Sequence, residues 1–284
     1  MLGSMAVRYF RASGDHVITL SSRFSADDPR PFFAELKARA ERRPFDLTIN
    51  AIGAIPQRIS HALGAAHAED RFAEARWYAQ LNVLLPLRLR CSGLLGILVH
   101  PSTDCVFAPV PPVGVTERAV DAPHDASDLY GRSKSLGEQV LALGIGRTLV
   151  IRSSIIGPGG GLMRWVSECR GTVQGYTNHL WNGLTTLHWC QLADSLSESM
   201  RSRGGNGELH QPGTAVVTKA ELLESIVTVF AMPARVVPSG SPEGVTGRVL
   251  RPTLQRPPIK MQLSEMREFM DRTDPMWRRS EMLG

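Results

Sequence analysis

The sequence predicts an α/β fold, in which helices cover both faces of a parallel sheet and a smaller region follows. Two observations predict it. Short β-rich runs alternate with longer helical stretches through the first half of the chain. Beyond Ile156 the alternation breaks, and glycine, proline and amide side chains become frequent. We therefore divide the chain into residues 1–157 and residues 158–284, and expect about 183–212 to return to the sheet.

The elements of the first region can be read in order from their patterns. We expect helices at 3–12, 29–43, 69–92 and from Tyr130 onward, and strands within 16–20, 45–55, 96–107 and 147–157. Gly14 ends the first helix. The second region is less regular. It has a short strand within 202–213, an amphipathic helix at 218–230 and a tail rich in glycine and proline.

The totals exclude several classes of protein. Of the 284 residues, 43% are hydrophobic and 21% charged, as in an ordinary globular protein. No apolar run approaches the roughly 20 residues that span a bilayer, and no export signal opens the chain. The four cysteines form no C-x-x-C pair, so neither a metal site nor a disulfide framework is expected. We expect a cytoplasmic protein with no membrane partner.

The net charge of +5 raises the question of nucleic-acid binding. Arginines are spread along the whole chain, and no basic block is interleaved with aromatic residues. We therefore expect no nucleic-acid partner.

A tyrosine and a lysine four residues apart, Tyr130 and Lys134, begin the helix in "DLYGRSKSLGE". Residues at this spacing share one face of a helix. An ammonium near a phenol lowers the pKa of the phenol, which can then exchange a proton with a carbonyl or alcohol. The pattern is also common by chance, and an ordinary surface helix is the alternative reading.

Two hydroxyl residues, Ser102 and Thr103, follow the strand that precedes this helix. Ligands of open α/β sheets bind at the carboxyl ends of the strands. A hydroxyl there can donate a hydrogen bond to the substrate oxygen that Tyr130 protonates. The alternative, a simple turn or helix cap, is stronger for Ser102 than for Thr103.

Three segments, "STDCVF", "DLYGRSKSLGE" and "LVIRSSIIGPGGGL", together resemble the extended short-chain dehydrogenase/reductase superfamily. Within it the chain is most similar to dTDP-4-dehydrorhamnose reductases and related sugar-nucleotide reductases. The resemblance runs from about Gly3 through "NGLTTLHW", and more faintly to Leu223. It implies a Rossmann-type doubly wound parallel sheet with a smaller C-terminal substrate-binding domain. It also implies a nicotinamide cofactor, a nucleotide-sugar substrate and a possible homodimer.

The resemblance implies roles for individual residues. Thr103, Tyr130 and Lys134 match the catalytic trio, with Tyr130 as general acid. Lys134 would hold the nicotinamide ribose and Thr103 the substrate carbonyl. Other matching positions would bind cofactor: Gly3, Asn50, Ala51, Ile52 and Arg152, the last beside Ser153 and Ser154 on the nicotinamide side. Ala51 and Ile52 are less secure because "AIGAIPQ" departs from the usual alanine-rich run. Asn82 falls where the family has a structural asparagine, although a plain polar helix residue is an equal alternative.

The end of the second strand bears on the choice of cofactor. An acidic residue there binds the ribose of NAD, whereas an arginine accommodates the phosphate of NADP. The segment "TLSSRF" offers Ser22 and Arg23 and no carboxylate. We therefore favour NADP(H) over NAD(H). The alternative is that Arg23 is a solvated loop residue.

Candidate substrate contacts lie in "GYTNHLWNGLTT". Aromatic and amide side chains there could stack on or hydrogen-bond a nucleotide or sugar, although such clusters are more often core. The set of candidates is Ser102, Ser153, Tyr176, Asn178, Trp181 and Asn182.

These observations favour an NADPH-dependent reductase for the ketone of a nucleotide-activated 4-keto-6-deoxy sugar. An epimerase or dehydratase of the same superfamily is one alternative, although Asp104 is the only carboxylate beside Thr103. A catalytically idle, cofactor-binding regulatory protein is the other.

The beginning of the chain departs from the family pattern. Gly3 fits the third glycine of the G-x-x-G-x-x-G turn, whereas the first strand and first two glycines have no counterpart. A start site placed too late, or a natural truncation, would explain this. We expect the chain as given to bind NADP(H) poorly, and an added strand and glycine turn to restore binding.

Overall fold

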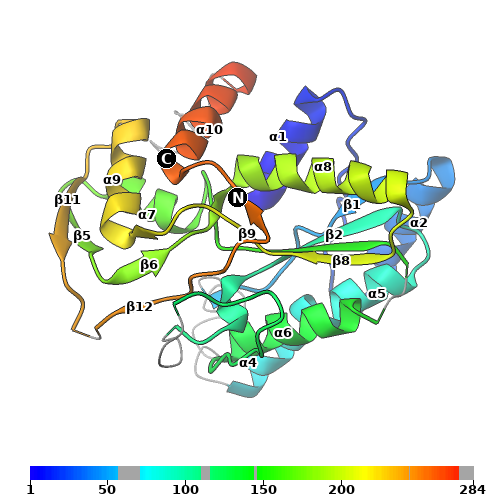
Figure 1. Cartoon of the computed structure of the whole chain (residues 1–284). Helices are drawn as coiled ribbons and strands as arrows, with labels where there is room; N and C mark the ends of the chain where they lie inside the picture. Colours follow the sequence, from blue (N-terminus) through cyan, green and yellow to red (C-terminus); the bar gives the residue numbers. More distant parts are fainter. Residues whose placement is uncertain (57–70, 110–115, 144–145, 243, 275–284) are drawn as a thin grey trace.

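The structure is a computed structural model. It describes the whole chain except residues 57–70, 110–115, 144–145, 243 and 275–284 (Figure 1). The main sheet has four parallel strands in the order β1-β2-β3-β8. They are β1 (Leu47–Ile49), β2 (Ile97–Ser102), β3 (Thr148–Arg152) and β8 (Gly207–His210). A doubly wound parallel sheet is thereby confirmed.

Helices cover both faces of this sheet (Figure 1). One face carries α1 (Leu2–Ala12) and α8 (Thr186–Arg203). The other carries α6 (Leu129–Leu141) and a long helical stretch. That stretch is continuous through α4 (Arg71–Tyr78), the π-helical turn η3 (Ala79–Leu84) and α5 (Leu85–Cys91). Helix α2 (Arg30–Arg42) packs at the same face through Phe32 and Leu36.

The central strands are buried on both faces, which their apolar sequences require. Leu98 and Val150 face the core formed with α2, α5 and α6, whereas Val99 and Leu149 face the core beneath α1 and α8. The register pairs Ser102 with Arg152. The last residues of β2 and β3 therefore lie side by side at the carboxyl edge, where the site forms.

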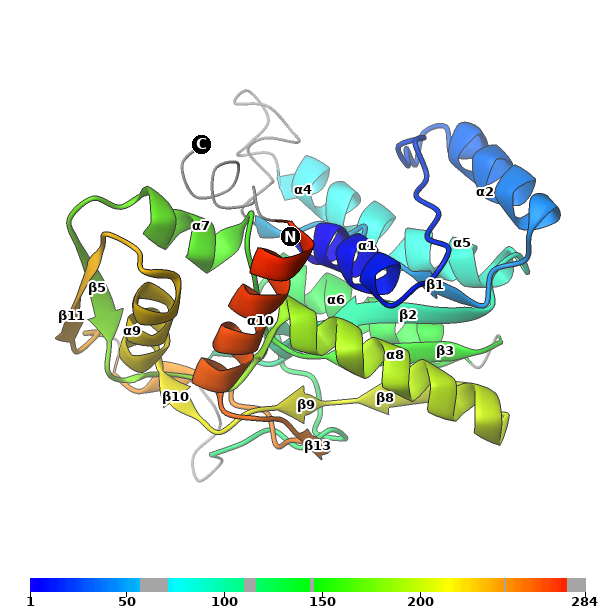
Figure 2. The ribbon, with the colours of Figure 1, turned by 90° about the horizontal axis from the view of Figure 1, so that it is seen from above.

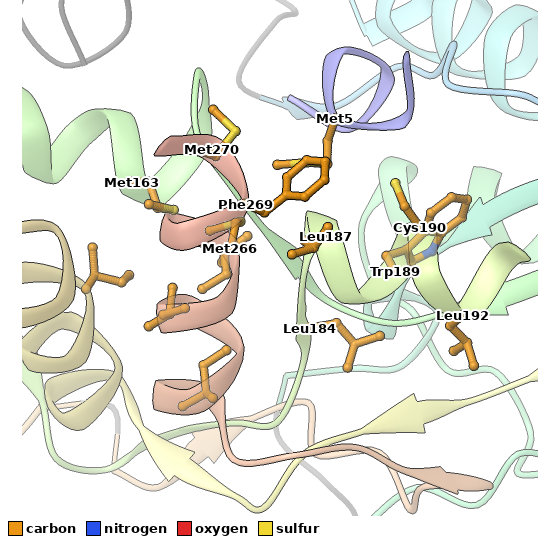
Figure 3. Close-up of a cluster of buried hydrophobic side chains, with 14 of the residues drawn as sticks. Met5, Met163, Leu184, Leu187, Trp189, Cys190, Leu192, Met266, Phe269 and Met270 are labelled. Carbon is orange, nitrogen blue, oxygen red and sulfur yellow. The ribbon is translucent and has the colours of Figure 1, made fainter. Parts of the chain in front are cut away.

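Helix α10 (Ile259–Thr273) joins the second of these cores (Figure 3). Phe269 and Met270 lie near Met5 of α1 and Leu187 of α8 in the close-up. This helix is not among the elements expected from the sequence, where the region after the helix at 218–230 is described only as rich in glycine and proline. Its apolar residues recur at helical spacing after Pro258, so a periodicity count over 259–273 would have found it.

The smaller region consists of short ladders and two helices beside the carboxyl edge (Figure 2). Two ladders organise it: β5 with β11, and β6 between β10 and β12. Its elements are α7 (Gly161–Glu168), β5 (Thr172–Tyr176), β6 (His179–Trp181), β10 (Val217–Thr218), α9 (Lys219–Phe230), β11 (Arg235–Ser239) and β12 (Thr246–Gly247). Four further two-residue strands form two pairs, β4 (Ile155–Ile156) with β7 (Leu184–Thr185), and β9 (Pro212–Gly213) with β13 (Leu254–Gln255). The chain then continues through α8 on the main sheet and through β8, which pairs with β3.

The strand expected at 16–20 is wrong. These residues lie in irregular structure and pair with no strand among the described residues. A strand forms only where a neighbour supplies the other half of its hydrogen-bond ladder. Here β1 is the edge of the sheet, because within the described chain it pairs only with β2. The β-rich sequence "HVITL" therefore stays unpaired.

The other expected helices and strands are confirmed, including α9 with its capping box between Thr218 and Glu221. None of the helices in the described part of the chain is long and apolar enough to cross a membrane.

Candidate active site

Thr103 and Tyr130 meet at the carboxyl end of β2. Thr103 precedes the short 3₁₀ turn η4 (Asp104–Val106), and its side chain caps that turn by accepting from the Cys105 amide at 3.1 Å. Helix α6 starts at Asp128, whose carboxylate accepts from the Gly131 amide at 2.7 Å. A Cβ on Gly131 would lie 2.1 Å from the Cys105 carbonyl oxygen. Only glycine allows α6 to approach η4 this closely, which brings Tyr130 to Thr103.

The phenol of Tyr130 is held in its protonated form. Burial is the main cause that raises its pKa, and a hydrogen bond with Thr103 partly opposes it. Lys134 is not among the described groups that shift this pKa. The expected lowering of the Tyr130 pKa by Lys134 is therefore not what this structure shows. The reason is geometric, because the Lys134 ammonium is directed elsewhere.

Lys134 is buried, and two groups of β2 hold its ammonium. Its Nζ donates to the Pro101 carbonyl oxygen at 2.6 Å and lies 3.3 Å from Nε2 of His100. Burial lowers the pKa of Lys134 to about 8. The pKa of His100 is also lowered, by burial first and by Lys134 second, so this imidazole is neutral. Nδ1 of His100 lies 3.2 Å from Nδ2 of Asn50.

Asn50 connects this buried chain to the loop that follows β1. Its Oδ1 accepts from the Ile52 amide at 3.2 Å, whereas Ala51 and Ile52 are exposed at the carboxyl edge. Ile52 is 38% exposed, although it is apolar. A Cβ on Gly3 would lie 3.2 Å from the Cβ of Ala51, so α1 packs closely against this loop. The cofactor-binding role expected of Gly3 stays a prediction.

Asn82 is a structural asparagine in this fold. It lies in the π-helical turn η3 and is 1% exposed. Its Oδ1 accepts from the Ala54 amide at 2.9 Å, and its Nδ2 donates to the Ala54 carbonyl and to Ser133 Oγ. Asn82 therefore ties the loop after β1 to α6, which carries Tyr130. Wide turns of this kind are frequent near functional sites.

A carboxylate approaches the residues expected to select the cofactor. Glu35 of α2 accepts from the backbone amides of Ser21 and Ser22 at 2.8 to 3.1 Å. These hydrogen bonds, with the Ser22 amide first, lower the pKa of Glu35 to about 2. Glu35 was not expected beside Ser21 and Ser22 from the sequence, because it belongs to helix α2 farther along the chain. Arg23 is exposed beside it.

Arg152, expected to border the nicotinamide side, has its guanidinium bonded inside the protein. It is 1% exposed, and its guanidinium pairs with both oxygens of Glu138, at 3.0 and 2.6 Å. It also donates to the Val120 carbonyl and to Gln211 Oε1, and lies 2.9 Å from His124 Nε2. With its N–H groups directed to the protein, Arg152 holds elements together. Ser102 shares this arrangement, since its hydroxyl donates to Glu138.

Two candidate substrate residues, Asn178 and Asn182, also bond to backbone. Nδ2 of Asn178 donates to the carbonyls of Ser241 and Gly244, and its Oδ1 accepts from the Ser241 amide. Asn182 bonds both the carbonyl and the amide of Leu250, at 2.7 and 3.1 Å. Side-chain amides that are hydrogen-bonded to the backbone in this way stabilise the fold, because each group used there is unavailable to a ligand.

The remaining candidates differ in exposure. The hydroxyl of Ser153 is buried and donates to the Ser154 carbonyl oxygen. Tyr176 is half-buried, and its ring lies 4.5 Å from that of His179. Trp181 is buried and donates from Nε1 to Ser154 Oγ at 2.8 Å. Tyr176 is thus the most open of these groups.

Three residues of the site were missed by sequence reasoning. His100 contacts Lys134, Glu138 organises Arg152 and Ser102, and the ring of Tyr78 lies 5.9 Å from that of Tyr130. For Glu138 a signal existed, since it lies four residues after Lys134 on the same helix face. No local pattern in the sequence singles out Tyr78.

The fold and this site define a dinucleotide-dependent enzyme class with a tyrosine–lysine pair at the sheet's carboxyl edge. Residues 1–162 match the model of the NAD dependent epimerase/dehydratase family. The chain belongs to that family. Among curated proteins, none matches this sequence.

Solved structures confirm the fold over nearly the whole chain, at identities too low to transfer a reaction. A dTDP-4-dehydrorhamnose reductase from Bacillus anthracis str. Ames, in complex with NADP, is 13% identical, with a TM-score of 0.69 over 94% of this chain and 95% of that one. The Clostridium acetobutylicum reductase is 13% identical, with a TM-score of 0.67 and coverages of 95% and 96%. A dTDP-glucose 4,6-dehydratase from Bacillus anthracis, in complex with NAD, is 17% identical, with a TM-score of 0.63 and coverages of 98% and 96%.

The residues at the carboxyl edge are compatible with the expected nicotinamide cofactor, and which of them would hold it stays a prediction. Contacts run from Lys134 through His100 and Asn50 to the exposed loop at Ala51 and Ile52. At the pyrophosphate end, the described residues offer Gly3 and the first turn of α1. The expectation of weak NADP(H) binding stays a prediction, and calorimetric titration of this chain with NADPH would test it.

Proposed function

We propose that the protein reduces the ketone of a nucleotide-activated 4-keto-6-deoxy sugar with NADPH, and that Tyr130 donates the proton. The contact of Thr103 with Tyr130, one helical turn before the buried Lys134, carries this proposal. A phenol kept protonated suits a reduction, in which the carbonyl oxygen must receive a proton. Bound NADPH would supply the hydride to the carbonyl carbon.

The surrounding residues have complementary tasks in this scheme. The hydroxyl of Thr103 would hold the substrate oxygen beside the phenol. After the proton has left Tyr130, the Thr103 hydroxyl would stabilise the negative charge on the phenol oxygen. Lys134 would hold the nicotinamide ribose, from the position that Pro101 and His100 give its ammonium. Preorganised donors around a developing charge are the usual main source of such stabilisation.

The preference for NADPH rests on Arg23. It is an exposed arginine at the end of the run expected to carry the ribose site. The neighbouring carboxylate of Glu35 is engaged by the amides of Ser21 and Ser22, which leaves Arg23 as the group open to a phosphate. NAD is the alternative if Glu35 turns to a ribose instead.

An epimerase or dehydratase reaction is the second candidate. The family model and the likeness to a dTDP-glucose 4,6-dehydratase favour it. In this chain, however, the carboxylate that follows Thr103 is bonded to it, since Thr103 Oγ1 donates to Asp104 Oδ1 at 3.0 Å. Such a reaction consumes no NADPH overall, so cofactor consumption separates the two candidates.

The test is turnover of a panel of keto-sugar nucleotides with NADPH, followed by cofactor absorbance. Tyr130→Phe removes the proton donor and keeps the ring packed against Tyr78, so turnover should fall by roughly 10²-fold or more. Tyr9→Phe, which removes a hydroxyl bonded to Asp194 of α8, is the matched control and should retain activity. Near-normal turnover in Tyr130→Phe would contradict the role of Tyr130, and product without NADPH consumption would favour an epimerase.

A further inference from the structure

Lys219 has a fixed place at the start of α9, beside the site. The strand β10 leads into it and pairs Val217 with Trp181 of β6. Thr218 and Glu221 then form a reciprocal cap, in which the Thr218 amide bonds the carboxylate and the Glu221 amide bonds the hydroxyl. This cap fixes the backbone of Lys219. Its ammonium lies 5.6 Å from the centre of the Trp181 ring.

The Lys219 ammonium faces the groups that follow Thr103. Asp104 and Cys105 both act on it electrostatically, and burial lowers its pKa. Through the described ranges, no acceptor lies within hydrogen-bond or ion-pair distance of its Nζ. A half-buried ammonium without an acceptor has lost part of its hydration, and the face of the Trp181 ring replaces only part of it. Lys219 is therefore placed for a partner that comes from outside the chain.

The neighbouring cation shows what is different about Lys219. Arg248 also acts electrostatically on Cys105. Its Nε donates to the Phe107 carbonyl at 2.7 Å, and its guanidinium lies 3.8 Å from Asp128. Arg248 is thus engaged by the protein. Of the two cations beside the Thr103–Cys105 turn, Lys219 is the one left open.

We infer that Lys219 binds an anionic oxygen of the substrate, in the first instance a phosphate of a nucleoside diphosphate. The inference rests on the proposed function, in that the same site is taken to hold a nucleotide sugar. A carboxylate on the sugar itself would offer the same oxygen chemistry. In either case Lys219 orients the substrate on the side of Trp181, so that the sugar lies next to Thr103 and Tyr130.

The test is calorimetric binding, which needs no turnover. UDP, dTDP, uridine, thymidine, glucuronate and galacturonate are titrated into the wild-type protein, with and without saturating NADPH. Lys219→Met removes the charge and keeps an apolar side chain of similar length. Lys260→Met is the matched control, because Lys260 is an exposed lysine in the first turn of the neighbouring helix α10. Lys219→Arg keeps the charge.

Lys219→Met should weaken UDP or dTDP binding by about 10- to 150-fold, the value of one charge-assisted hydrogen bond. Uridine, thymidine and the Lys260→Met control should be unaffected, and Lys219→Arg should retain most of the affinity. A loss confined to glucuronate or galacturonate would identify a sugar carboxylate as the source. The melting temperature of Lys219→Met should fall little, since only the contact with the Trp181 ring is lost.

Two results would overturn the inference. One is wild-type affinity of Lys219→Met for every phosphate- and carboxylate-bearing probe. The other is a wild-type protein that binds none of these probes under either condition. Failure of the proposed reduction is a separate outcome, because an inactive protein can still show the charge-dependent binding of UDP or dTDP.

Discussion

Two clusters of polar residues lie side by side at the carboxyl edge of the sheet, and they differ in how completely their groups are used. Around Arg152 the guanidinium and the carboxylate of Glu138 are both bonded inside the protein. Beside the turn that follows Thr103, in contrast, the ammonium of Lys219 acts on Asp104 and Cys105 and has no hydrogen-bond acceptor among the described residues. A cluster with every group bonded stabilises a fold, whereas one with open groups can bind and react.

The structural role of the Arg152 cluster can be tested by removing the Glu138 carboxylate. Glu138→Ala leaves the Arg152 charge buried without its main partner and should lower the free energy of unfolding by about 3–5 kcal/mol. Glu168→Ala is the matched control, because Arg164 and Glu168 form the same kind of pair at 2.7 Å on the exposed face of α7. Chemical denaturation measures both. Similar stabilities for the two variants would show that the Arg152 cluster is not structural.

Arg23 and Glu35 allow the cofactor end to be tested next. Arg23→Ala should weaken NADPH binding by about 10- to 150-fold and leave NADH nearly unchanged, because only NADPH carries the extra phosphate. Glu35→Gln should change neither strongly, since Glu35 already bonds the Ser21 and Ser22 amides. Equal losses for both cofactors in Arg23→Ala would rule out phosphate recognition. Arg42→Ala, an exposed arginine of α2, is the control.

His100 tests the polar contacts around Lys134, because it contacts both Lys134 and Asn50. His100→Leu removes one buried polar contact from Asn50 and one from Lys134. It should lower the free energy of unfolding by about 1–3 kcal/mol. Turnover should also fall, because Lys134 loses one of its two contacts. His179→Leu is the control, since Nε2 of His179 is buried without a hydrogen-bond partner in the described structure. Thermal melts and turnover would contradict the role of His100 if both histidine variants behaved alike.

The smallest expected effect is on pH dependence. The pKa of Lys134 is lowered to about 8, so its ammonium is present below that pH and is lost as the pH rises through it. The raised pKa of Tyr130 keeps the phenol protonated over the same interval. The rate constant kcat/KM should therefore decline above about pH 8 because of Lys134, approaching tenfold per pH unit. A flat profile up to pH 10 would contradict this assignment.

The amino-acid sequence is sufficient to predict the class of fold, and it also indicates the residues that we propose to react. Apolar runs that alternate with helical stretches indicate a parallel sheet, because strands covered by helices on both faces are apolar throughout. The spacing of Tyr130 and Lys134 places both residues on one helix face. Thr103 directly follows a strand, so its hydroxyl is expected at the carboxyl edge of the sheet. These inferences depend on local periodicity, which the order of residues contains in full.

The tertiary structure alone decided which polar groups stay open. Arg152, Asn178 and Asn182 look like ligand-binding residues in the sequence, and their partners lie 14 to 68 positions away. The strand expected at 16–20 failed for the same reason, because its pairing depends on a neighbour and not on its own composition. Lys219 is the converse case, an ordinary helix-start lysine by sequence. Its open ammonium exists only because α9 and η4 are brought together by the fold.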